Sequence, residues 1–114
     1  SPQWGNAANE WEEPVKPTVY FYAFASEEGT EIPVKVMKGK VVLQNFTYQT
    51  NKGFNYIPYD LTVSAEGKVA YEKSLQKIFL PTATDGNIYL PKGRYTIVFT
   101  MPDGFEEERT LDIY

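Results

Sequence analysis

The chain has 114 residues, with 11 basic and 15 acidic side chains, so its net charge is −4. It contains no Cys and no His, which removes disulfides, thiolate chemistry, the usual general base and the commonest metal ligand. Because its Lys and Arg are scattered, an acidic chain of this kind is a poor partner for nucleic acid or anionic membranes. No apolar run approaches the length of about 20 residues that spans a bilayer.

The sequence predicts two parts: an extended tail or linker at residues 1–16, and one β-sandwich domain at residues 17–114. The tail has little apolar periodicity, and Pro14 and Pro17 close it before the first strand. The tail also holds Trp4 and Trp11, the only tryptophans of the chain. These indoles either pack on the sandwich or belong to a binding segment.

The first half of the domain shows the alternation of short strands. Residues 19–24 are apolar on both faces, as in a strand that is covered on both sides. Residues 32–36 alternate between apolar and other side chains, and Pro33 indicates an edge strand or the first residues of a strand. Residues 41–43 and 46–48 follow as further strand segments after the Lys38-Gly39 turn.

The second half continues the same rhythm. We expect a long strand at residues 57–65, a turn at Glu66-Gly67-Lys68 and a hairpin partner at residues 69–75. Further strands are expected at residues 88–90, 95–99 and 105–113. No segment shows a sustained helical period, so we predict an all-β antiparallel sandwich of about seven to eight strands. The predicted core includes Leu61, Val63, Tyr71, Ile97, Phe99, Leu111 and Ile113.

Tyr95 stands at the beginning of a strand, just after the turn formed by Pro91 and Gly93. A tyrosine in this place can fold its ring over the edge of a sandwich while its hydroxyl bonds an upstream carbonyl. This is the tyrosine corner of immunoglobulin-like and fibronectin type III-like sandwiches. We therefore assign Tyr95 a structural role.

Few residues of the chain suggest a catalytic or metal-binding role. Glu106-Glu107-Glu108 is the one acidic run in the predicted strands, and alternation sends Glu107 to the opposite face from its neighbours. A solvated edge strand explains this run better than a pair of catalytic carboxylates, because charges on a terminal strand discourage edge-to-edge pairing. We predict no catalytic residue, no metal ligand and no cofactor, and hence no enzyme.

The aromatic residues are the candidate contact residues. Tyr20, Tyr22 and Phe24 share one face of a predicted strand, and Phe54, Tyr56 and Tyr59 crowd a second region. Such rings either fill the core or form a surface that stacks on sugars or anchors a protein. The candidate ligand-contact residues are Trp4, Trp11, Tyr20, Tyr22 and Tyr56.

The segment Tyr59-Asp60-Leu61-Thr62-Val63-Ser64-Ala65-Glu66-Gly67-Lys68-Val69-Ala70-Tyr71-Glu72 resembles the strand–turn–strand of small immunoglobulin-like domains of unknown function exported by Bacteroides. Gly93-Arg94-Tyr95-Thr96-Ile97-Val98-Phe99-Thr100, with Asp103-Gly104 and a final strand, resembles the same family's ending. The resemblance covers residues 55–114. It implies the fold and export to the periplasm, outer membrane or exterior, and it transfers no site residues.

These observations lead to three functional hypotheses. The first is a non-catalytic cell-envelope or surface module for binding, adhesion or structural support, with a protein or glycan partner. The alternatives are a carbohydrate-binding accessory module that uses exposed rings, and a secretion-sorting domain. The end Leu111-Asp112-Ile113-Tyr114 lacks the basic residue that usually closes sorting domains. If the domain is a cell-envelope or surface module, residues 1–16 would be a spacer between the sandwich and a lipid anchor placed upstream.

Overall fold

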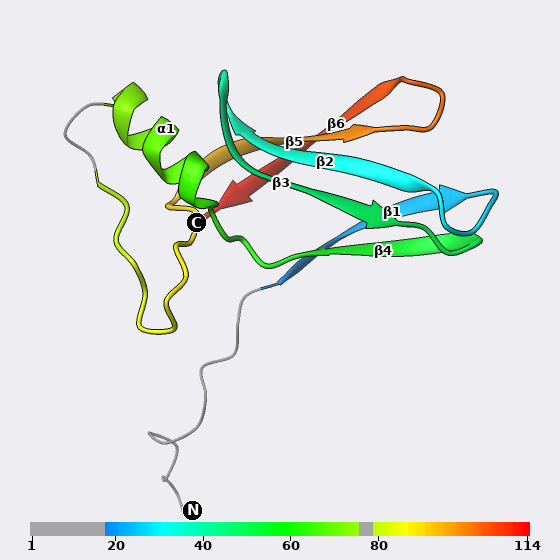
Figure 1. Ribbon diagram of the computed structural model, residues 1–114, viewed down its shortest axis with the longest axis horizontal. Helices are drawn as coiled ribbons and strands as arrows, with labels where there is room; N and C mark the ends of the chain where they lie inside the picture. Colours follow the sequence, from blue (N-terminus) through cyan, green and yellow to red (C-terminus); the bar gives the residue numbers. More distant parts are fainter. Residues whose placement is uncertain (1–17, 76–78) are drawn as a thin grey trace, which may run out of the picture.

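The computed structural model describes residues 18–75 and 79–114, which form two antiparallel sheets and one helix (Figure 1). The strands are β1 (Val19–Ala25), β2 (Glu31–Lys38), β3 (Val41–Gln49), β4 (Gly53–Tyr59), β5 (Gly93–Thr100) and β6 (Glu106–Ile113). The helix α1 (Ala65–Leu75) lies between β4 and β5 in the chain. Strands β1 and β4 form a two-stranded sheet, and the order of the four-stranded sheet is β3-β2-β5-β6.

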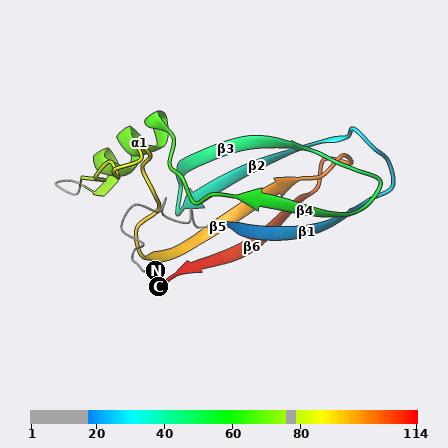
Figure 2. The same ribbon diagram turned by 90° about the horizontal axis from the view of Figure 1, so that it is seen from below.

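The two sheets lie one over the other, with α1 beyond one end of the strands (Figure 2). Alternation in each strand sends one set of side chains into the core. In β2, Ile32, Val34 and Val36 are buried between exposed neighbours. The predicted core is confirmed: all its members are either buried or packed against the buried cluster.

The expected strands at residues 57–65 and 69–75 are wrong. Strand β4 ends at Tyr59, and α1 takes the place of the expected hairpin partner. The chain leaves the strand direction at Leu61, whose φ of 64° lies in the left-handed region. Ser64 then caps the helix, because its Oγ accepts a hydrogen bond from the amide of Gly67 at 2.9 Å.

Two contacts explain why this segment is helical. Lys68 and Glu72 form an ion pair of 2.9 Å one turn apart on α1. Gly67 and Tyr71 share the face that packs on the core, and both are buried, while Val69 is exposed. Val69 and Tyr71 therefore lie on different sides of a helix, and they do not share one face of a strand.

The expected strand at residues 88–90 is reduced to a single antiparallel bridge between Thr62 and Tyr89. The residues that the structure describes thus hold six strands in two sheets. Pro33 is the third residue of β2 and pairs with Thr47 of β3. The pairing of β2 with β5 starts only at Val34, so the missing amide of Pro33 breaks no bond on that side.

Tyr95 is only 1% exposed and lies at the start of β5. Its hydroxyl donates a hydrogen bond of 2.5 Å to the carbonyl oxygen of Pro91, four residues upstream. Nζ of Lys38 lies 4.9 Å from the centre of the ring. Burial, followed by the neighbouring Tyr71, raises the pKa of Tyr95 to about 12. The residue therefore acts as a neutral, hydrogen-bonded support of the fold.

Candidate functional site

The outer face of the two-stranded sheet carries three cross-strand pairs of large apolar side chains. The pairs are Tyr20–Pro58, Tyr22–Tyr56 and Phe24–Phe54. The five rings are 56–76% exposed, while the alternate residues of the same strands point toward the core. We call these six side chains the aromatic face.

Two of the pairs are in ring contact. The ring centres of Tyr22 and Tyr56 are 5.1 Å apart at an interplanar angle of 86°, and those of Phe24 and Phe54 are 5.6 Å apart at 78°. Both are edge-to-face arrangements, worth about 0.5–1.5 kcal/mol each. The rings therefore hold one another in place before any ligand binds. Because paired rings stand nearly perpendicular, the face is ridged rather than flat.

The strands below the aromatic face contain no charged residue: neither β1 nor β4 has an Asp, Glu, Lys or Arg. Contiguous apolar surface of this kind is uncommon on a monomeric protein and is typical of a contact surface. Tyrosine is suited to such a surface because it presents a large rigid ring with a polar tip at a small entropic cost.

Two buried polar residues fix the end of the sheet next to Phe24 and Phe54. The side-chain oxygen of Asn55 accepts bonds from the Asn51 amide at 2.7 Å and the Tyr48 hydroxyl at 3.1 Å. Its side-chain nitrogen donates to the carbonyls of Asn51 at 2.8 Å and Gly53 at 3.0 Å. All the hydrogen-bonding capacity of this amide is used on the turn before β4 and on the strand ends beside it.

Thr50 joins that turn to the loop between β1 and β2. Its hydroxyl donates to the carbonyl of Glu27 at 2.8 Å and accepts from the amide of Thr30 at 3.1 Å. The backbone of Thr50 is bonded to both Gly29 and Thr30. The two strands of the aromatic face therefore enter and leave the sheet through turns that are tied to each other.

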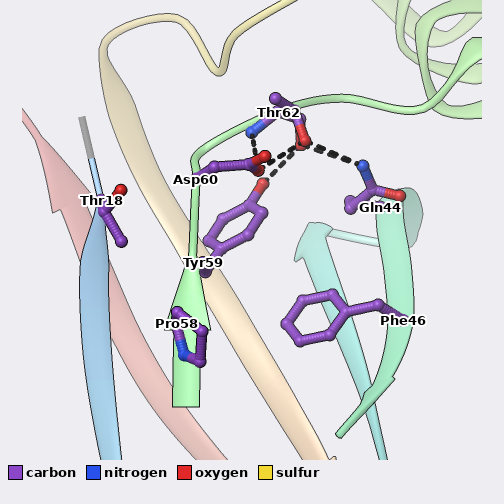
Figure 3. A pocket seen from close by; sticks show the side chains of 7 residues that line it. All are labelled: Thr18, Gln44, Phe46, Pro58, Tyr59, Asp60 and Thr62. Carbon is purple, nitrogen blue, oxygen red and sulfur yellow. Dashed lines mark hydrogen bonds between the residues drawn. The ribbon is translucent and has the colours of Figure 1, made fainter. Parts of the chain in front are cut away.

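A second feature is a cavity of about 380 Å³ at the other end of β4 (Figure 3). Rings of Phe46 and Tyr59 form one side, stacked with centres 5.9 Å apart. The polar groups bond each other: the Thr62 hydroxyl donates to Asp60 Oδ1 at 2.7 Å, and Gln44 Nε2 donates to the Thr62 hydroxyl at 3.1 Å. Since these groups already use each other as partners, the cavity is a structural junction.

Tyr59, which lines this cavity, also has a structural role. Its hydroxyl donates to the carbonyl of Thr62 at 2.6 Å, and the side chain is 3% exposed. Burial, with a smaller contribution from the charge of Asp60, raises its pKa far above the usual value. A phenol that keeps its proton in this way positions the chain at the end of β4 and offers no general base near neutral pH.

The structure brings three predicted contact residues onto one surface. Tyr20, Tyr22 and Tyr56 all belong to the aromatic face, whereas Tyr59 points to the core. The sequence suggested two separate aromatic regions, and the pairing of β1 with β4 merges them. The predicted tail with Trp4 and Trp11 lies outside the described residues.

Phe24 and Phe54 were grouped with these tyrosines in the sequence but left out of the candidate ligand-contact residues, although they are the two most exposed rings of the face. The signal that finds them is the alternation itself, because each stands two positions along its strand from an exposed tyrosine. Which strand pairs with which is not visible in the sequence, and this pairing is what turns separate rings into a surface.

Within residues 18–75 and 79–114, no group of acidic side chains is arranged to hold a metal ion. The helix of the described part is neither long nor apolar enough to cross a membrane. Compared with known proteins, the chain matches no protein-family model, no curated protein and no solved structure.

Proposed function

We propose that this domain is a non-catalytic binding module of the cell envelope or cell surface, and that the aromatic face is its contact surface for a protein partner. One observation carries the proposal: five exposed rings stand together on a sheet without charges. Large rings at the centre of an interface supply most of its binding energy when water is excluded around them.

The arrangement of the rings favours a protein over a flat glycan. A sugar stacks on the face of a ring, and an extended glycan needs several rings in one plane. In the pairs Tyr22–Tyr56 and Phe24–Phe54 the ring planes differ by 86° and 78°. At most one ring of each pair can lie flat against a glycan, whereas ridges and grooves suit interdigitating side chains of a protein.

The finer fold assignment is part of the same proposal. We infer an immunoglobulin-like sandwich, in which α1 replaces part of the usual strand set. The buried Tyr95 with its bond to Pro91 supports this assignment, since it is the contact of a tyrosine corner. Export is inferred from the resemblance to Bacteroides domains, and residues 1–16 would be the spacer.

Two parallel screens test the proposal: a glycan array and a phage-displayed library of random dodecapeptides. Each is probed with the natural chain, with a Tyr22→Ser/Tyr56→Ser variant and with a Thr47→Ser variant. Thr47 is a matched control because it is exposed on a strand of the other sheet.

We expect peptide binders that lose at least tenfold in affinity with the Tyr22→Ser/Tyr56→Ser variant and keep their affinity with Thr47→Ser. Glycan binding lost in the same double variant would replace the protein partner with a carbohydrate. Binders that bind all three chains equally, or no binder in either screen, would contradict the proposal.

A further inference from the structure

The aromatic face is built around a central pair of tyrosines. Tyr22 is the middle residue of β1, Tyr56 is the middle residue of β4, and the two are paired across the strands. One apolar pair lies on each side of them, and these pairs are Phe24–Phe54 and Tyr20–Pro58. A face with this arrangement can meet a copy of itself with its centre on the centre of the other, as a two-fold interface requires.

Opposite charges stand just beyond the two ends of β4. Lys52 directly precedes the strand and Asp60 directly follows it, each four positions from Tyr56. Both continue the alternation of the outward residues of β4, and both are exposed. In residues 18–75 and 79–114, neither forms an ion pair. Asp60 accepts only from the neutral amide and hydroxyl of Thr62, so its charge is not compensated.

The corresponding positions beyond β1 carry no charge. They are Thr18 and Ser26, and both are exposed. Glu27 and Glu28 follow on the loop that carries the chain over to β2 of the other sheet (Figure 1). The outer face therefore has a positive end and a negative end along β4, with only apolar side chains between them.

This polarity favours one orientation of a second copy on the aromatic face. A two-fold axis that lies between the copies and runs across the strands, over Tyr56, reverses the strand direction. Lys52 of each copy then stands opposite Asp60 of the other, so the two charge pairs form together. An axis that runs along the strands would place Lys52 opposite Ser26 and would leave both charges without a counterpart.

The shapes of the side chains agree with the same orientation. Reversal of the strand direction brings Phe54 of one copy over Pro58 of the other. Phe54 is the most exposed ring of the face, and Pro58 is its smallest side chain. The highest point of each copy thus meets the lowest point of the other, and close packing of this kind is typical of specific interfaces.

The area of the aromatic face is sufficient for a dimer. Phe and Tyr side chains that are fully covered bury about 150–250 Å² each. With exposed fractions of 56–76%, the five rings offer roughly 600 Å² on each copy. Two copies would bury about 1,200 Å², which is at the lower end of the range of about 1,200–2,000 Å² for specific interfaces.

We propose that the aromatic face binds the same face of a second copy of this chain, with antiparallel strands and with Lys52 of each copy paired with Asp60 of the other. The rings supply the contact area, and the two charge pairs at the rim set the orientation. This inference rests on the proposed function, because it names the partner of the same surface.

The test is sedimentation equilibrium of the full chain from micromolar to millimolar concentration. The natural chain is compared with Lys52→Glu, with Asp60→Lys and with an equimolar mixture of these two variants. Lys35→Glu is the matched control, since it makes the same change of charge at an exposed position of β2, on the outer face of the other sheet.

We expect the natural chain and Lys35→Glu to dimerise with the same affinity. Lys52→Glu and Asp60→Lys should each weaken the dimer about tenfold, because like charges then meet at both ends of the interface. The mixture should regain an affinity close to that of the natural chain, since in a mixed dimer each reversed charge meets the other. Added salt should reduce the differences between the chains.

Two further variants test the rings. Tyr22→Ser/Tyr56→Ser removes the central pair and should be monomeric, whereas Thr47→Ser on the other sheet should dimerise like the natural chain. Circular dichroism and thermal unfolding check that each variant is folded. Asp60→Lys loses the bonds to Thr62, so if it does not fold, the comparison of Lys52→Glu with Lys35→Glu decides the test.

Three outcomes would overturn this inference. The first is a natural chain that stays monomeric at millimolar concentration; peptide binders that depend on Tyr22 and Tyr56 would then leave the proposed function in place. The second is a dimer that persists in Tyr22→Ser/Tyr56→Ser, because its interface would lie elsewhere. The third is a dimer that Lys52→Glu and Lys35→Glu affect equally, because Lys52 would then not face Asp60.

Discussion

The two sheets share a similar inner face and have very different outer faces. Both send Ile, Val, Phe and Tyr side chains into the common core. Outside, the four-stranded sheet carries charges such as Glu31 and Lys35, and Arg94 pairs with Asp112 across β5 and β6 at 2.7 Å. The outer side of β1 and β4 has only rings and a proline. Because folding requires only the inner faces, the apolar outer face of β1 and β4 is not explained by the core, and this difference supports the proposal that it is a contact surface.

The first prediction concerns the turn that holds the aromatic face. Replacing Asn55 with Ala leaves the Asn51 amide, the Tyr48 hydroxyl and two carbonyls without a partner. We expect a loss of about 3 kcal/mol in the free energy of unfolding, measured by urea denaturation. Asn45→Ala, on the exposed side of β3, should cost less than about 0.5 kcal/mol. Equal effects of the two variants would show that the turn carries no special stability.

The second prediction tests the packing of α1 against β3, an edge strand of the four-stranded sheet. A Cβ added at Gly67 would lie 1.9 Å from the carbonyl oxygen of Leu43, so Gly67→Ala must push α1 away from β3. We expect a loss of about 2 kcal/mol, after the better helix propensity of Ala is counted. Glu66→Ala, one position earlier and exposed, is the control and should be nearly neutral. A stabilised Gly67→Ala variant would contradict this packing.

The third prediction concerns the pH dependence of stability, to which Tyr95 of the four-stranded sheet contributes. The pKa of Tyr95 is raised to about 12 in the fold, against 10.0 for an ordinary tyrosine. Stability is therefore fully present below about pH 10 and falls as the pH rises toward 12, because the unfolded chain loses this proton first. Urea denaturation between pH 8 and 12 should show a loss in the free energy of unfolding to which Tyr95 contributes on the order of 2 kcal/mol.

Tyr95→Phe should reduce this alkaline loss. At neutral pH it should cost about 0.5–1.5 kcal/mol through the missing bond to Pro91. Part of the alkaline loss should remain, because the pKa of Tyr59 is raised as well. An unchanged midpoint at neutral pH together with an unchanged alkaline profile would show that Tyr95 has no such role.

The smallest expected effects are the coupling energies of two cross-strand pairs, one from the outer face of each sheet. A double-mutant cycle on Tyr22 and Tyr56, with Ala replacements, should give a coupling of about 0.5–1.5 kcal/mol that 1 M salt leaves unchanged. The same cycle on Arg94 and Asp112 should give less than about 1 kcal/mol and should weaken in salt. A Tyr22–Tyr56 coupling that disappears in salt would show that ring contact is not its source.

The region around Ser64 shows where the sequence was misleading. The alternation at Ile57, Tyr59, Leu61 and Val63 predicted one long strand, yet β4 ends at Tyr59. Ser64 and the Lys68–Glu72 spacing were visible helix signals. These signals were outweighed by the apolar residues at every second position, which are typical of a strand. Local pattern cannot decide such a case, because the helix is stabilised by the contact of Gly67 with Leu43, 24 residues away in the chain.

Composition and alternation alone determined the β class, most of the inward residues and the bond of Tyr95 to an upstream carbonyl, because each depends on neighbours in the chain. They also separated apolar from charged strands, as β1 and β6 show. Tertiary structure decided the rest. Only the pairing of β1 with β4 placed Tyr22 against Tyr56, and only the packing of two strands over four brought Arg109 of β6 to the carbonyl of Tyr22. Such contacts depend on strand order and register, which the free energy of the whole core selects.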